Sequence, residues 1–278
     1  MAESIPGLLR AYDLQPRKGL GQNFLNDPVA LARIVDAAEL GSDDTVVEVG
    51  AGLGTLTRLL VERAGEILAV ELDDRLVGVL RQRFAGVPNL QVIHADILKL
   101  DDLGTAPGGY KVVANLPYYI TSAVLRRFLS REPRPGLMVV TMQREVAGRI
   151  VARPGKMSLL AVSVQLYGRP QIVARIPAGA FYPPPKVDSA VVRIDVKKRP
   201  TVLLAEGITE EIFFRVVRAG FAQRRKTLRN SLSAGLHRRP ESVGIALAQV
   251  GVDPRRRAQT LNLDEWAVVT EALFDSPD

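Results

Sequence analysis

The chain is 278 residues long, carries a net charge of +7, and contains no cysteine and only two histidines. The lack of cysteine excludes disulfides, thiolate chemistry and cysteine-based zinc sites, and two histidines argue against a histidine-rich metal centre or a Ser-His-Asp triad. The length suits one α/β domain with a smaller second domain, and the positive charge suits a polyanionic partner. We therefore predict chemistry without a metal.

The N-terminal region is predicted to form a lead-in and a loop. Residues Met1 to Lys18 indicate a loosely structured, basic lead-in. The stretch from Gly19 to Pro28 is polar and punctuated by glycine, which favours a loop. Asp27 is placed to cap a helix that begins at Pro28 and ends at Ala38. Taken alone, this stretch indicates only an ordinary helix entry.

The run from Thr45 to Thr57 organises the rest of the chain. Its β-branched residues predict a strand over Thr45–Val49, the glycines Gly50, Gly52 and Gly54 predict a turn, and the apolar pattern beyond predicts a helix. Glycine leaves no Cβ between the backbone and a ligand, so this order favours a cofactor loop. The spacing is G-x-G-x-G and not the G-x-G-x-x-G of dinucleotide binders, and a tight connection without a ligand is an equally good interpretation of the motif alone.

The next two predicted strands each end near an acid. Glu66–Glu71 reads as a strand whose last residue lies roughly twenty residues after the glycines, where a ribose-binding carboxylate is expected. The strand Asn89–His94 is followed by Asp96, which could accept a hydrogen bond from an adenine amine. Three strands that each end in a ligand-facing group favour a cofactor site over a simple turn.

A fourth strand, Lys111–Ala114, follows a Gly/Pro-rich loop from Leu103 to Gly109 and runs into Asn115-Leu-Pro-Tyr118. Asn115 offers a carbonyl acceptor, Pro117 stiffens the turn, and Tyr118 offers a flat face on which a base can stack. An acceptor, a rigid turn and an aromatic ring at a strand end can hold a planar exocyclic amine. The competing interpretation makes Tyr118 and the adjacent tyrosine half-buried core aromatics.

Further elements complete the first domain. They are a strand at 137–142, helices at 143–151 and 158–166, and strands at 171–175 and 190–196. Strands that alternate with helices predict a parallel, doubly wound sheet that binds ligands beyond the carboxyl ends of its strands. The segment from Phe181 to Asp188 contains three consecutive prolines, which form a stiff arm that presents Phe181 and Tyr182. The alternative is a turn anchored by aromatics.

Beyond a boundary near residues 197–200 the pattern is helical throughout. A basic cluster with helical spacing and interleaved phenylalanines predicts a phosphate-binding surface, and a solvated helix face is the alternative. From Thr201 onward there are 11 basic and 10 acidic residues, so attraction to RNA must come from the cluster itself. Its predicted RNA-binding residues are Arg215, Arg218, Arg224, Arg225, Lys226 and Arg229.

Taken together, the motifs resemble those of the rRNA adenine N6,N6-dimethyltransferases, especially the bacterial small-subunit branch. The matching segments begin at Gly21 (GQNFL), Glu48 (EVGAGLGTLT), Asn115 (NLPY), Phe181 (FYPPPKVDSAVV) and Gln223 (QRRKTLRNSL). One departure is Pro154–Ser158, where the family has a Tyr-Gly-x-Leu-Ser type of sequence. The resemblance implies a Rossmann-like S-adenosylmethionine-dependent methyltransferase sheet over residues 1–198 and a smaller all-helical, RNA- or ribosome-binding domain over residues 199–278.

The resemblance also implies a role for each motif. S-adenosylmethionine would be the methyl donor, with S-adenosylhomocysteine as product and no metal. The expected cofactor-binding residues are Gln22, Asn23, Leu25, Gly50, Gly52, Glu71, Leu72, Asp96, Ile97 and Asn115. The expected catalytic residues are Asn115, Leu116, Pro117, Tyr118 and Phe181, with the two aromatic rings stacking on a flipped adenine.

By the same resemblance, the substrate would be two adjacent adenines in the 3′-terminal hairpin loop of 16S rRNA, within the small ribosomal subunit or its precursor. Two alternatives remain: a 23S rRNA adenine dimethylase of the antibiotic-resistance type, and a ribosome-assembly factor that keeps the fold without turnover. The chain has neither a signal-peptide pattern nor an apolar run of ~18 residues, so we expect a cytoplasmic monomer without a membrane partner.

Overall fold

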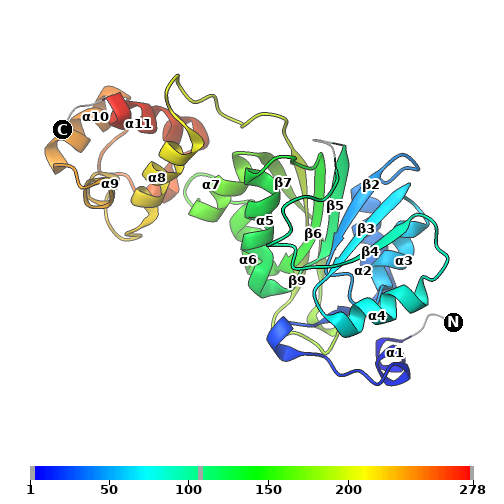
Figure 1. Cartoon of the computed structure of the whole chain (residues 1–278). Coiled ribbons are helices and arrows are strands. Elements are labelled where there is room, and N and C mark those ends of the chain that lie inside the picture. The colour runs from blue at the N-terminus through cyan, green and yellow to red at the C-terminus, as the bar shows by residue number, and fades with distance from the viewer. Residues whose placement is uncertain (1–3, 106–108, 276–278) are drawn as a thin grey trace. The chain divides into compact units, whose positions relative to one another are not determined.

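The computed structural model describes residues 4–105 and 109–275 (Figure 1). Residues 106–108 of the predicted loop from Leu103 to Gly109 lie outside the described residues. Contacts group the chain into two units, one of residues 1–148 with 168–198 and one of residues 149–167 with 199–278. The predicted division placed residues 149–167 in the first domain, whereas in the structure they group with the C-terminal helices.

The first unit is built on a seven-stranded sheet with the order β4-β3-β2-β5-β6-β9-β7. Its strands are β2 (Thr45–Val49), β3 (Glu66–Glu71), β4 (Leu90–His94), β5 (Tyr110–Asn115), β6 (Leu137–Gln143), β7 (Gly168–Ile176) and β9 (Ser189–Val196). The strands β2 to β6 are parallel, as predicted. At the other edge of the sheet β9 is antiparallel to β6 and β7 is antiparallel to β9, so the sheet as a whole is mixed.

Apolar strands and helices form the core of this unit. Its helices include α2 (Pro28–Ala38), α3 (Thr55–Val61), α4 (Asp74–Arg83), α5 (Thr121–Ser130) and α6 (Arg144–Ile150). Asp27 caps α2 as predicted, since its carboxylate accepts the N–H groups of Val29 and Ala30 at 2.8 and 3.1 Å. Buried residues of α2, such as Ile34 and Val35, pack with strand residues into one apolar cluster. Figure 1 shows α5 lying along the sheet.

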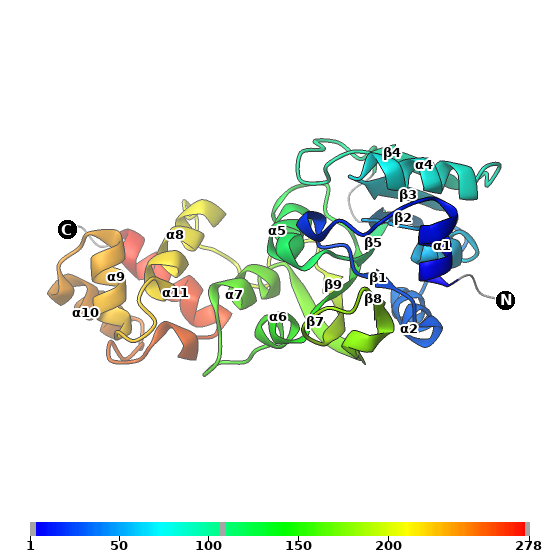
Figure 2. The ribbon, with the colours of Figure 1, turned by 90° about the horizontal axis from the view of Figure 1, so that it is seen from below.

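The N-terminal region contains a helix where a loosely structured lead-in was predicted. The helix α1 (Ile5–Ala11) begins after Ser4, whose hydroxyl accepts the N–H of Gly7 at 3.2 Å. Its buried face packs beside α4 (Figure 2). The apolar residues of this cluster are Ile5, Leu8, Leu9, Phe24, Leu53, Leu76 and Val79. Tertiary packing therefore stabilises a helix too short to be stable by itself.

A short two-stranded ribbon joins the N-terminal loop to the proline-rich arm. It consists of β1 (Phe24–Leu25) and β8 (Phe181–Tyr182), which run antiparallel with Leu25 opposite Phe181. The ribbon brings two motifs together that are far apart in sequence.

The described residues of the second unit form helices joined by turns and loops, without a strand. It contains α7 (Leu159–Gln165), α8 (Glu210–Phe221), α9 (Leu228–Leu236), α10 (Pro240–Gln249) and α11 (Leu263–Asp275). Tyr167, just after α7, stacks on Phe214 with ring centroids 6.4 Å apart, and its hydroxyl bonds Glu210. These contacts explain why 149–167 groups with the C-terminal helices. The departure at Pro154–Ser158 lies here too, where Gln259 accepts two of its backbone N–H groups.

Candidate active site

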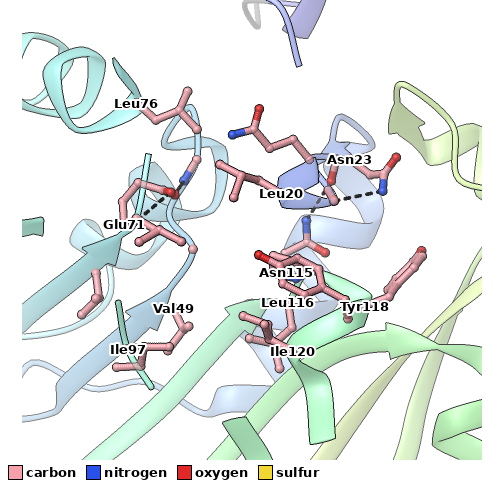
Figure 3. A pocket seen from close by; sticks show the side chains of 18 of the residues that line it. Leu20, Asn23, Val49, Glu71, Leu76, Ile97, Asn115, Leu116, Tyr118 and Ile120 are labelled. Carbon is pink, nitrogen blue, oxygen red and sulfur yellow. Dashed lines mark hydrogen bonds between the residues drawn. The ribbon is translucent and has the colours of Figure 1, made fainter. Parts of the chain in front are cut away.

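A cavity of about 220 Å³ opens at the carboxyl ends of β2, β3, β4 and β5 (Figure 3). The chain order of the strands reverses between β2 and β5, which is where open α/β sheets bind ligands. Nearly all of the predicted cofactor and catalytic residues line this one cavity. They are Gln22, Asn23, Gly50, Gly52, Glu71, Leu72, Asp96, Ile97, Asn115, Leu116, Pro117, Tyr118 and Phe181.

The glycine turn after β2 forms one wall of the cavity. Gly50 and Gly52 have φ of +73° and +61°, a region that residues with a Cβ rarely adopt. A Cβ on Gly50 would lie 3.8 Å from Pro117, which lines the same cavity. A Cβ on Gly52 would press on the ring of Phe24 at 3.3 Å. Glycine is therefore favoured here by the backbone conformation, and at Gly52 also by the close packing of Phe24.

The Glu71 carboxylate lies at the end of β3 and is bound by backbone donors. It accepts N–H groups from Gly52 and Leu72 at 2.8 Å and from Asp73 at 2.9 Å. Burial raises the pKa of Glu71, and these three donors act in the opposite direction. A carboxylate has about four acceptor positions. Glu71 therefore keeps acceptor capacity for a ribose hydroxyl without giving up a backbone bond.

A second acid, Glu48, is buried behind the glycine turn. Its carboxyl group accepts the Thr57 hydroxyl at 2.6 Å. Burial raises the pKa of Glu48 to about 8, while the Thr57 bond opposes this and the Glu71 charge adds to it. Glu48 is therefore largely protonated at neutral pH. No function was predicted for Glu48 from the sequence.

The third strand end carries Asp96 between apolar neighbours. One oxygen, Oδ1, accepts the N–H of Leu98 at 3.0 Å and orients the side chain in a turn. The other oxygen accepts no hydrogen bond from the described residues. Ile97 is buried and Leu72 is 45% exposed, and both line the cavity beside Asp96. A polar edge between two apolar side chains suits a planar heterocycle with an exocyclic amine.

The Asn115–Tyr118 segment faces Glu71 across the pocket, as Figure 3 shows. The Nδ2 of Asn115 donates to the backbone oxygen of Asn23 at 3.3 Å. That bond leaves Oδ1 of Asn115 without a donor among the described residues. The Tyr118 hydroxyl and the Ser189 hydroxyl lie 2.6 Å apart, which fixes the Tyr118 ring. Burial raises the pKa of Tyr118, and the Ser189 bond opposes the shift.

The core-aromatic alternative is wrong for Tyr119, which is 59% exposed and lines the cavity. Phe181 is 4% exposed and contributes to both the core and the cavity wall. Leu25 does not line the cavity, contrary to its prediction as a cofactor contact. Its side chain is 1% exposed in the apolar core, because β1 pairing turns it away from the pocket.

A polar cluster missed by sequence reasoning ties the N-terminal loop to α4. The Asp73 side chain is fully buried and binds Arg17, Gln22 and Arg75. Burial raises the pKa of Asp73, but hydrogen bonds from Arg75 and Gln22 outweigh it and bring the pKa down to about 2. The sequence did contain one sign of this cluster: Asp73 lies two residues after Glu71 and occupies the N-cap of α4.

A wider groove of about 1050 Å³ adjoins the cavity within the same unit. It lies between the N-terminal segment and the proline arm, and it includes Arg10, Lys18, Tyr182 and Lys186. Tyr118 lines both the groove and the cavity. Single-stranded nucleic acid could therefore run along the groove while one base enters the cavity.

The predicted basic cluster lies in the helical unit, and its six basic residues are all exposed. The cluster spans two helices and the turn between them, because α8 ends at Phe221 and α9 begins at Leu228. Arg224, Arg225 and Lys226 occupy the turn between the two helices. Phe221 does not face a ligand, since it packs on Trp266 with ring centroids 5.6 Å apart.

Comparison with known proteins identifies the family. Residues 14–274 match the family model described as ribosomal RNA adenine dimethylase. The chain belongs to this family. A relative from Dehalococcoides mccartyi, ribosomal RNA small subunit methyltransferase A, is 48% identical over 97% of this chain and 92% of its own length.

Two solved structures are similar to this chain. The 23S rRNA methyltransferase ErmE is 31% identical, with a TM-score of 0.72, over 91% of this chain and all of that chain. A dimethyladenosine transferase from Plasmodium falciparum shares the fold, with a TM-score of 0.74 and 24% identity over 88% of this chain and 95% of that chain. The predicted family, enzyme class and Rossmann-like fold with a C-terminal helical region are confirmed.

Two further observations concern the described part of the chain. No helix there combines the length and apolar character that crossing a membrane requires. No set of three or more histidine, aspartate or glutamate side chains there is arranged to hold a metal ion.

Proposed function

We propose that the protein transfers methyl groups from S-adenosylmethionine to N6 of two adjacent adenines in the 3′-terminal hairpin loop of 16S rRNA. We propose further that it acts as a cytoplasmic monomer on the small subunit or its precursor. The supporting observation is that Glu71, Asp96, Asn115 and Tyr118 share one cavity at the switch point of the sheet. Separate placement of these side chains would have removed the basis for the proposal.

The cavity residues fit the methyl donor. The glycine turn would admit its methionine part, Glu71 would accept a ribose hydroxyl, and the open oxygen of Asp96 would accept the adenine amine. Leu72 and Ile97 would cover the faces of the adenine ring. When bound, S-adenosylmethionine supplies an electrophilic methyl group on its sulfonium sulfur. S-adenosylhomocysteine is the product that these residues would release.

Asn115 would orient the target amine. The lone pair of an exocyclic adenine nitrogen is delocalised into the ring, which makes the nitrogen a poor nucleophile. The Oδ1 of Asn115 and the backbone carbonyl of Leu116 could each accept one N–H of that amine and so localise the lone pair on nitrogen. The contribution of the protein would be positioning and preorganised dipoles. The surplus proton can leave to water after transfer, so no side-chain base is required.

Tyr118 and Phe181 would hold the adenine outside its RNA stack. Extracting a base costs a few kcal/mol and is cheapest in a loop. Stacking on an aromatic ring returns about 1–3 kcal/mol per base. The Tyr118 ring is fixed through Ser189, so little further ordering would be needed. Pro117 keeps the segment in one conformation.

The helical unit would bind the ribosomal RNA backbone. Its exposed basic residues extend from α8 through the turn at Arg224–Lys226 into α9. Phosphate contacts of this kind increase affinity without reading sequence. The first unit would then select the target adenines. The helical unit would position the first unit on the small ribosomal subunit.

A 23S rRNA target is the main competing proposal, because ErmE is 31% identical to this chain. The 48% identity to a small subunit methyltransferase favours the 16S target. A non-catalytic assembly factor is disfavoured by the intact acceptor and stacking residues in the cavity. Mass spectrometry of both rRNAs from cells lacking the protein tests the target, because dimethyladenosine should be missing from 16S rRNA alone.

Replacement of Asn115 tests the chemical role. Loss of a positioned acceptor costs about 10²- to 10³-fold in turnover, so Asn115→Ala should lower kcat by about that factor. Affinity for S-adenosylhomocysteine, measured by isothermal titration, should stay within about tenfold. Tritiated methyl transfer to small-subunit particles reports turnover. A parallel loss of affinity and turnover would make Asn115 structural and refute the proposal.

A further inference from the structure

We propose that Asp73 and Gln22 form a latch that holds residues 17–23 as a wall of the cofactor cavity. Both are positioning residues for the methyl donor that the proposed function requires. The latch determines how firmly the donor is enclosed, and it acts at a distance from the transferred methyl group.

The anchor of the latch is the Asp73 carboxylate, whose side chain is 0% exposed. Its Oδ2 accepts Nε2 of Gln22 at 2.8 Å, and its Oδ1 accepts Nη1 of Arg17 at 3.2 Å. Hydrogen bonds to a buried charge are among the stronger ones in proteins. Arg75, from the first turn of α4, holds the same carboxylate at 2.7 Å and keeps it in place.

Both polar atoms of the Gln22 side chain form hydrogen bonds. Its Nε2 reaches Asp73, and its Oε1 accepts the backbone N–H of Arg17 at 2.7 Å. Gln22 therefore links two ends of the loop through the Arg17 backbone, and it links the loop to Asp73 at the start of α4. Because both polar ends are engaged within the protein, the Gln22 amide shapes the wall of the cavity.

The held segment separates the two binding spaces. Leu20 lines the cavity and Lys18 lines the groove, while Gly21, Gln22 and Asn23 line both. The segment also reaches the reacting end of the site, since the backbone oxygen of Asn23 receives Nδ2 of Asn115 at 3.3 Å. Release of the latch would thus open the donor cavity.

The test uses the full chain and the variants Gln22→Ala and Asp73→Asn. The matched control is Arg63→Ala, which breaks an exposed 3.0 Å pair with Asp36 elsewhere in the first unit. Hydrogen exchange of the backbone amides of residues 20–22 is measured without ligand. Affinity for S-adenosylhomocysteine is measured by isothermal titration, and methyl transfer is measured at saturating donor.

Both latch variants should lose protection at residues 20–22 by about tenfold and bind S-adenosylhomocysteine about tenfold more weakly, which corresponds to about 1.4 kcal/mol. KM for the donor should rise while kcat stays within about twofold of the parent value. The double variant should be no worse than the poorer single variant, because both remove the same link. The Arg63 control should leave these quantities unchanged.

Unchanged protection and affinity in Gln22→Ala would overturn the latch, as would a fall in kcat without a change in affinity. Gln22→Ala decides the matter if Asp73→Asn does not fold, because it leaves the α4 cap intact. If the parent protein failed to bind S-adenosylhomocysteine, the proposed function would fail, whereas the exchange difference would still report the latch.

Discussion

Glu48 should make the stability of the first unit depend on pH. Its pKa is raised from 4.5 to about 8 by burial, so the folded protein retains a proton that the unfolded chain has lost. The stability contributed by this proton is complete below pH 4.5 and is lost as the pH rises toward 8. The slope is about 1.4 kcal/mol per pH unit, so the free energy of unfolding should fall by roughly 3 to 4 kcal/mol between pH 5 and pH 8.

Replacing Glu48 with glutamine should remove this dependence. The amide keeps an oxygen that can accept the Thr57 hydroxyl, and it cannot ionise. The variant should therefore gain stability over the parent as the pH rises. Hydrogen exchange of the β2 amides measures the free energy of opening directly in the first unit. Parallel curves for parent and variant from pH 5 to pH 8 would refute the burial argument, and the exposed Glu62→Gln is the control.

Two further substitutions test the RNA contacts. Replacing Arg224 and Arg225 together with alanine should weaken binding to small-subunit particles and reduce the slope of log affinity against log salt by about 1.5; an unchanged slope would make both arginines part of a solvated surface. Tyr118→Phe should retain most activity because it keeps the ring, whereas Tyr118→Ala should lose about 10- to 100-fold in kcat/KM from lost stacking. Equal losses in the two Tyr118 variants would assign the effect to the Ser189 hydrogen bond.

The sequence predicted the central strands and the cavity well, for a physical reason. Runs such as Thr45–Val49 and Glu66–Glu71 are buried on both faces, so their composition marks them and the observed bounds match. The carboxyl ends of parallel strands meet at one edge of the sheet. Residues at those ends, Glu71, Asp96 and Asn115, were therefore expected to converge, and they do.

The features that sequence reasoning missed depend on partners distant in the chain. The helix α1 is stabilised by packing on residues of α4, and neither segment indicates the other. The break between α8 and α9 falls within a helical pattern, and only the packing of Phe221 on Trp266 shows how the end of α8 is anchored. Asp73 is an unremarkable acid in the sequence, and its partners Arg17 and Gln22 lie more than fifty residues away.

The grouping of residues 149–167 with the C-terminal helices affects how the protein can be divided. A fragment ending at residue 198 would keep α7 but lose α8, and with it the surface against which Tyr167 stacks. Apolar side chains such as Val162 and Leu166, fully buried in the intact chain, would then face water.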